Sequence, residues 1–378
     1  MGINRILAEY VYIDMSFFSF WMAMRFLRRG TTRTILLAAM LPLCAAARLQ
    51  AQEAPSPGAS PTSNAQAPID ETTDTPTFKT QTNLVSVFFT VRGKDGLPIT
   101  NLDKSDCTIY EDKVAQTTKN FERMTNLPLS MGIMLDTSGS QQNVLQLEKD
   151  TGGAFLRRIL RPKDEAFLIS FDSNIDLLAD YTNNASQLIR AMNKAQINVP
   201  MGSSGIAGMG NGPVNTQRTP GTLLYDAVFV AAHDKLHQEA GRKVLIMLTD
   251  GEDEGSQLKM EAAIEAAQKS NAIIYVILIA DRRAYAMAGE MYSGAGAMEK
   301  MTKDTGGRMI DVGNNGNKLE DAFAQIENDL RTQYLLSYTP LDTRFDGAFR
   351  YLNMNCKSNG KVQMRKGYYA LASAAGTD

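Results

Sequence analysis

The chain has 378 residues, of which 44% are hydrophobic and 21% charged, and its formal net charge is -2. This length allows two domains, and the composition is that of a globular protein. The near-neutral charge excludes the strong basic excess expected of a nucleic-acid-binding protein, so we predict no nucleic-acid partner.

The first 52 residues are the one basic region, with six arginines against one Asp and one Glu. An apolar stretch follows at 35–47, and small residues come after it. This layout predicts a secretory signal region at 1–52, with translation starting at Met22 or Met24. We therefore expect an exported protein that is periplasmic, on the cell surface or secreted. The alternative is a signal that is not cleaved, which would anchor the protein and be the protein's only link to the membrane.

The segment 53–77 contains five prolines among Ser, Thr, Ala and acidic residues, which predicts a disordered linker. Segments 78–127 and 336–371 are rich in β-branched and aromatic residues and are broken by turn residues. Neither is long enough for a stable independent domain. We predict that they form one β-sandwich together, followed by a short tail at 372–378.

The region between them, 128–335, alternates strand-like and helix-like patterns. Its apolar runs are nearly continuous, as expected for strands buried on both faces. Alternation of this kind predicts an α/β fold: a doubly wound, mostly parallel sheet with helices on both faces. The predicted strands are 131–135, 166–171, 244–248 and 272–280.

Each of these four strands runs into an aspartate, and the carboxyl ends of parallel strands meet at one edge of the sheet. We interpret Asp172 and Asp281 as turn or cap residues, because Asp commonly opens turns. Asp136 differs, because Ser138 and Ser140 follow it at two-residue spacing in the sequence DTSGS. Three side-chain oxygens at this spacing suit a hard divalent cation.

Two further positions complete a known pattern, in which DxSxS is followed by a Thr in a later loop and an Asp that ends a central strand. Here the sequence PGTLLYDAV supplies Thr222 and KVLIMLTDGEDEG supplies Asp250. The chain thus resembles the von Willebrand factor type A (VWA) domain and its metal-ion-dependent adhesion site. The metal ligands that the resemblance implies are Asp136, Ser138, Ser140, Thr222 and Asp250.

This resemblance implies an adhesion or assembly module that is not an enzyme. It would bind Mg²⁺ (or Mn²⁺) and a protein partner that presents an Asp or Glu carboxylate to the ion, with no small-molecule substrate. The β segments on either side resemble those of exported bacterial proteins best known from Acidobacteria. Two loops, 199–221 and 281–298, are expected to surround the metal edge.

Outside the signal region the only cysteines are Cys107 and Cys356. In an exported protein they suggest a disulfide, and two buried thiols are the alternative.

Two other functions remain open. His233 and His237 lie four residues apart, at the spacing of a helical zinc site, with Asp234 in the position of a catalytic acid. A zinc hydrolase of this kind needs a third ligand, which the sequence does not identify. The other alternative is a structural envelope subunit in which the metal site is not essential.

Overall fold

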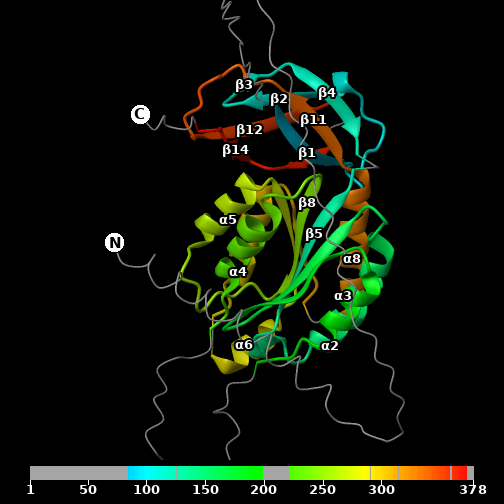
Figure 1. Ribbon diagram of the computed structural model, residues 1–378, viewed down its shortest axis with the longest axis vertical. Helices are drawn as coiled ribbons and strands as arrows, with labels where there is room; N and C mark the ends of the chain where they lie inside the picture. Colours follow the sequence, from blue (N-terminus) through cyan, green and yellow to red (C-terminus); the bar gives the residue numbers. More distant parts are fainter. Residues whose placement is uncertain are drawn as a thin grey trace, which may run out of the picture. The chain divides into compact units, whose positions relative to one another are not determined.

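The computed structural model describes residues 84–124, 127–198, 221–289, 291–313, 315–357 and 360–372 (Figure 1). The predicted signal region 1–52, the linker 53–77, the loop residues 199–220 and the tail residues 373–378 lie outside these ranges. Among the described residues, no helix combines the length and apolar character needed to span a membrane.

The central domain is built on a six-stranded sheet with the order β10-β9-β8-β5-β6-β7. All neighbouring strands are parallel except β7, which pairs antiparallel with β6 at one edge. The mostly parallel α/β sheet that the sequence predicts is therefore confirmed. The strands are β5 (Leu129–Asp136), β6 (Glu165–Phe171), β7 (Ile175–Thr182), β8 (Arg242–Thr249), β9 (Ala272–Leu278) and β10 (Met309–Asp311).

Helices cover both faces of this sheet (Figure 1). The first face carries α2 (Leu145–Ile159), α3 (Ala185–Met192) and α8 (Gly316–Thr332). The second carries α4 (Leu224–Val230), a π-helical turn η3 (Ala231–Leu236), α5 (Met260–Lys269) and α7 (Gly294–Thr305). A short helix α6 (Arg282–Ala288) lies in the segment after β9.

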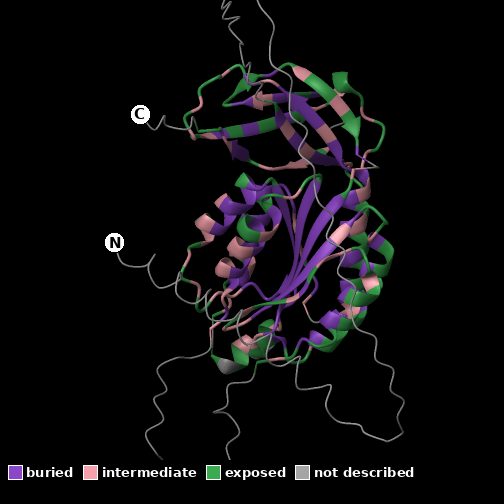
Figure 2. Cartoon of the chain, viewed as in Figure 1, coloured by how far each residue is buried: buried purple, intermediate pink, exposed green. Residues whose placement is uncertain are grey.

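Strand alternation explains the two cores. Successive side chains of a strand point to opposite faces, so Ile133 and Leu135 of β5 join the core beneath α2, whereas Met134 joins the core beneath α4. Gly132 shares the face of Met134, where a Cβ would lie 2.5 Å from the Phe167 ring. The central strands are buried along their whole length, as Figure 2 shows.

The remaining strands form two four-stranded sheets, in the orders β13-β1-β11-β4 and β14-β12-β2-β3. A shared apolar core, which includes Phe89, Ile109, Leu336 and Met354, lies between them. The strands are β1 (Val85–Arg92), β2 (Cys107–Glu111), β3 (Val114–Ala115), β4 (Thr118–Arg123), β11 (Tyr334–Tyr338), β12 (Phe349–Cys356), β13 (Lys361–Met364) and β14 (Gly367–Tyr369); a 3₁₀ turn, η1 (Lys104–Asp106), precedes β2.

Both ends of the described chain thus contribute to one sandwich, and β11 follows α8 almost directly. The strand pairing differs from the predicted domain boundary at one point. Tyr334 and Leu335 pair with Phe89 and Phe88 of β1, so the second part of the sandwich begins two residues before position 336. The helix α8, with its helical pattern of apolar residues, ends only two residues before β11 begins, and no turn residue marks the boundary in the sequence.

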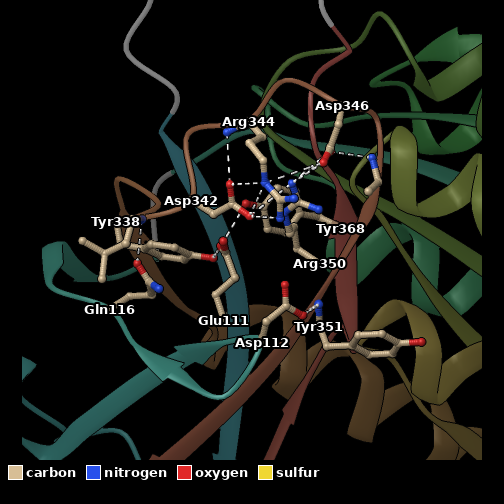
Figure 3. Close-up of polar contacts among 12 residues, drawn as sticks. Glu111, Asp112, Gln116, Tyr338, Asp342, Arg344, Asp346, Arg350, Tyr351 and Tyr368 are labelled. Atoms are coloured by element: carbon tan, nitrogen blue, oxygen red, sulfur yellow. Dashed lines mark hydrogen bonds and ion pairs between the residues drawn. The ribbon is translucent and has the colours of Figure 1, made fainter.

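A buried acid helps to hold the sandwich sheets together (Figure 3). Glu111 at the end of β2 is 2% exposed and accepts hydrogen bonds from the hydroxyls of Tyr338 and Tyr368, at 2.5 Å and 2.9 Å. Tyr338 belongs to the opposite sheet. The two phenols satisfy a carboxylate that would otherwise be strongly destabilising inside the sandwich.

The structure joins Cys107 and Cys356 by a disulfide. The two residues face each other directly in the antiparallel pairing of β2 with β12, at a sequence separation of 249. The bridge therefore connects the N-terminal and C-terminal segments of the sandwich, which the central domain separates in the sequence.

A buried ion cluster links the sandwich to the central domain. Asp329 on α8 is fully buried and pairs with Arg92 of β1 and with Arg308, which precedes β10. The Arg308 Nε lies 2.9 Å from Asp329 Oδ2. One carboxylate thus neutralises two cations where the two parts of the chain pack together.

We predict that Asp329→Asn lowers the free energy of unfolding by about 3–5 kcal/mol, because Arg92 and Arg308 then face each other without a counter-charge. Urea unfolding of the full chain measures this change. Asp321→Asn, an exposed position of the same helix, is the matched control and should change stability by less than about 0.5 kcal/mol. Equal stability of the two variants would contradict the role of the cluster.

We also predict that the Cys107→Ser, Cys356→Ser double variant loses about 2–5 kcal/mol of stability, because the bridge closes a long loop in the unfolded chain. Thermal unfolding with and without reductant is the measurement. Reductant should lower the melting temperature of the wild type towards that of the variant and leave the variant unchanged. A wild type indifferent to reductant would show that the bridge does not form.

Candidate metal site

The site is centred on two adjacent parallel strands, β5 and β8. Leu135 pairs with Leu248, so the next residues, Asp136 and Thr249, lie side by side. The Thr249 hydroxyl donates a hydrogen bond to Asp136 Oδ2 at 2.6 Å. Asp136 and Asp250 are 0% and 2% exposed. Strand pairing therefore places two buried carboxylates at one edge of the sheet.

The DTSGS turn brings two hydroxyls to the same edge. Ser138 N donates to Asp136 Oδ1 at 3.0 Å, which folds the chain back over the end of β5. A 3₁₀ turn, η2 (Gly139–Gln141), follows, and the Ser138 and Ser140 hydroxyl oxygens are 2.9 Å apart. Thr137 is oriented differently, since its hydroxyl donates to Asp172 Oδ2 at 2.7 Å. Only the alternate residues of the motif contribute oxygens to the site.

Thr222 lies just before α4 and is 6% exposed. Its carbonyl accepts a hydrogen bond from Glu254 N at 3.1 Å, so its backbone is attached to the loop that follows Asp250. The preceding residue is a glycine for a steric reason, because a Cβ on Gly221 would lie 2.5 Å from the Glu254 carbonyl oxygen. Leu223 N donates to the Asp172 carbonyl at 2.8 Å. These contacts hold Thr222 beside the strand ends.

The start of α4 is capped from outside the helix. Asp253 Oδ1 accepts from Leu224 N at 3.1 Å, and the Ser256 hydroxyl accepts from Tyr225 N at 3.0 Å. In return, Asp226 accepts from two backbone amides of the 251–259 loop. These caps are not predicted from the sequence. Asp253 and Ser256 have the spacing of a helix cap, but the helix that they cap is about 30 residues away in the chain.

The other two strand-end aspartates form turns, which confirms their interpretation from the sequence. Asp172 Oδ1 accepts from Asn174 N at 3.0 Å, and Asp281 Oδ1 accepts from Arg283 N at 3.1 Å. Asp172 also supports the site, because its side chain contacts Thr137 and its carbonyl holds Leu223.

Two tyrosines that carry no signal of this role in the sequence contact Asp250. The Tyr285 hydroxyl donates to Asp250 Oδ2 at 2.7 Å, and the Tyr292 hydroxyl donates to the Asp250 carbonyl at 2.8 Å. Glu252 accepts from Ser293 N and from Gly294 N, which holds this segment against the β8 loop. The segment 281–298 therefore lies at the metal edge, as predicted.

The electrostatics of the site fit a divalent cation. Burial and, after it, the nearby charge of Asp250 raise the pKa of Asp136 to about 7, although hydrogen bonds from Ser138 and Thr249 oppose this shift. Burial, followed by the charges of Asp136 and Asp250, also raises the pKa of Glu148 well above its usual range. The groups around the edge are carboxylates and hydroxyls, which are the ligands that Mg²⁺ and Mn²⁺ prefer.

The two histidines lie elsewhere, on the π-helical turn after α4 and at its end. Both are exposed, their ring centroids are 6.0 Å apart, and His233 Nδ1 lies 2.7 Å from Asp234 Oδ1. Over the described part of the chain, no three His, Cys, Asp or Glu residues are grouped so that they could hold a metal ion. The third ligand that a zinc hydrolase needs is thus not found among these residues.

The strand order, the helices on both faces and the positions of the motif make the region from β5 to α8 similar to a VWA domain. No protein-family model and no curated protein matches the chain. Similar solved structures include BatB from Bacteroides thetaiotaomicron, with 16% identity and a TM-score of 0.40 over 54% of this chain and 99% of that one.

Two further structures are similar at the same level. The VWA domain of SpRpn10 has 15% identity and a TM-score of 0.37, over 53% of this chain and 95% of that one. The mussel byssus protein PTMP1, with a zinc-occupied MIDAS (metal-ion-dependent adhesion site) motif, has 15% identity and a TM-score of 0.41. The match covers 57% of this chain and about half of PTMP1, 49%.

We predict that the metal-free protein loses stability as the pH rises from about 4 to about 7. The pKa of Asp136 is about 7 when folded, against 3.8 in the unfolded chain, so the folded state holds a proton that the unfolded state has released. Urea unfolding in chelator across this pH range measures the slope. Asp136→Asn should have a flatter slope than wild type, and the exposed-site variant Asp176→Asn should not. Equal slopes in all three proteins would contradict the shift.

Proposed function

We propose that the protein is an exported protein-binding module that uses a divalent cation, Mg²⁺ or Mn²⁺, at the end of β5. The observation that carries this proposal is the pairing of β5 with β8, which sets two buried carboxylates beside the paired hydroxyls of the DTSGS turn. The ligands would be Asp136, Ser138, Ser140, Thr222 and Asp250, each bound directly or through water.

The residues around the ion have different tasks. The hydroxyls of Ser138, Ser140 and Thr222 supply neutral oxygen ligands, and the carboxylates of Asp136 and Asp250 supply the negative charge. A bound cation would supply positive charge and a coordination position for a carboxylate from another protein. With only two acidic residues in the set, a partner's Asp or Glu would strengthen the coordination.

The surface next to the site supports a protein partner. In the sequence, Met287 and Met291 lie between the two tyrosines that contact Asp250, and they are 88% and 93% exposed. Methionines are flexible apolar side chains that adapt to binding surfaces. A partner surface that fits this edge would present an acidic residue surrounded by apolar side chains. The disulfide between Cys107 and Cys356 supports export, since such bridges persist in oxidising compartments.

The test is capture of envelope proteins by the purified full chain in Mg²⁺ and in EDTA. We expect a defined partner to bind in Mg²⁺, to be released by EDTA, and not to bind the Asp136→Ala variant. Asp176→Ala removes an exposed aspartate of β7 and serves as the matched control that keeps binding.

A partner that binds equally in Mg²⁺, in EDTA and to Asp136→Ala would refute the cation mechanism. That result would favour a structural subunit in which the metal site is not essential.

A further inference from the structure

Two buried acceptor groups near the proposed metal ligands have no partner in the described part of the chain. Glu148 is 0% exposed, and neither of its carboxylate oxygens accepts a hydrogen bond there. Gln141 is 1% exposed, and its Oε1 is likewise unpartnered. Buried carboxylates are nearly always hydrogen-bonded or paired, because an unsolvated charge is strongly destabilising. These acceptors therefore indicate a donor that the described residues do not supply.

The position of Glu148 directs its side chain towards the metal edge. It belongs to the first turn of α2, the helix that follows the DTSGS turn, and helical side chains tilt towards the helix N-terminus. The charges of both Asp136 and Asp250 act on its carboxyl group. The charge of the neighbouring Lys149 opposes their effect, but its ammonium group donates its hydrogen bond to the Ala195 carbonyl.

Gln141 occupies the turn between the motif and the helix. Its Nε2 lies 3.4 Å from the Ser140 hydroxyl oxygen and 3.4 Å from the Ile279 carbonyl oxygen, so the amide group reaches the site. Both unpartnered acceptors thus belong to the segment that the DTSGS turn opens. Gln141 lies in η2 and Glu148 in α2, whereas Tyr285, which contacts Asp250, belongs to α6.

Glu148 is not expected to coordinate the cation directly. Within the described ranges, no three acidic, His or Cys side chains come close enough together to hold one ion. A small divalent cation such as Mg²⁺ keeps several of its waters, and those waters point their hydrogens outward. Acceptors at the second layer around the ion orient its ligands and tune its affinity.

We infer that Glu148 is an outer-layer residue of the metal site, and that its carboxylate accepts hydrogen bonds from waters bound to the cation. Gln141 Oε1 is the second acceptor for these waters. This role rests on the proposed cation site and adds a third negative charge to it. Glu148 therefore tunes the affinity for Mg²⁺ and is not required to hold the fold together.

The test is calorimetric titration of the full chain with Mg²⁺, together with thermal unfolding in chelator. We expect Glu148→Gln to bind Mg²⁺ roughly 10- to 100-fold more weakly than wild type. Its metal-free melting temperature should equal or exceed that of wild type, because glutamine keeps the shape and replaces a buried carboxyl group that has no hydrogen-bond partner among the described residues. Glu148→Asp retains the charge with a shorter reach and should recover part of the affinity.

The matched control is Glu261→Gln, which replaces an exposed glutamate in the first turn of α5 and should leave the affinity unchanged. If wild type binds no Mg²⁺, both this inference and the proposed function are wrong. If wild type and Glu148→Gln bind Mg²⁺ equally, only this inference is wrong. A Glu148→Gln protein that is less stable without metal, or unfolded, would also overturn it by showing a structural role.

Discussion

The arrangement of the whole metal edge depends on the parallel pairing of β5 with β8. The register that places Leu135 opposite Leu248 carries the chain directly into Asp136 on one strand and Thr249-Asp250 on the other. Two carboxylates are then buried next to each other, and the charge of Asp250 opposes the ionisation of Asp136. Burial of both strands in two apolar cores enforces this register, so the unfavourable charge pair is maintained by hydrophobic packing.

The loops at this edge are held to one another and not only to the sheet. Asp172 contacts the DTSGS turn and the residue after Thr222, while Asp253 and Ser256 cap α4 from the loop that follows Asp250. Tyr285 and Tyr292 add a third segment. At the other end of α8, Asp329 and the strand β11 connect the central domain to the sandwich. A partner bound at the metal edge would thus contact segments that are already fixed relative to one another.

Much of this fold follows from local sequence patterns. The continuous apolar runs indicated the buried strands, and the spacing of Asp136, Ser138 and Ser140 indicated the turn, because both patterns are set within a few residues. The edge strand β7 was not predicted, since most of its residues are half-buried or exposed and its alternation is weak. Tyr285 and Glu148 were also not predicted as neighbours of the site. Their proximity arises from how α6 and α2 pack at the strand ends, and a lone Tyr or a first-turn Glu carries no local signal of it.

On the proposed function, the oxygens at the ends of β5 and β8 hold one divalent cation. Crystals of the full chain grown in Mn²⁺ and measured at the manganese absorption edge locate the ion directly. We expect one anomalous peak within coordination distance, about 2–2.5 Å, of the Ser138 and Ser140 hydroxyls. A crystal with no peak at this edge, or with its only peak at His233 and His237, would contradict it.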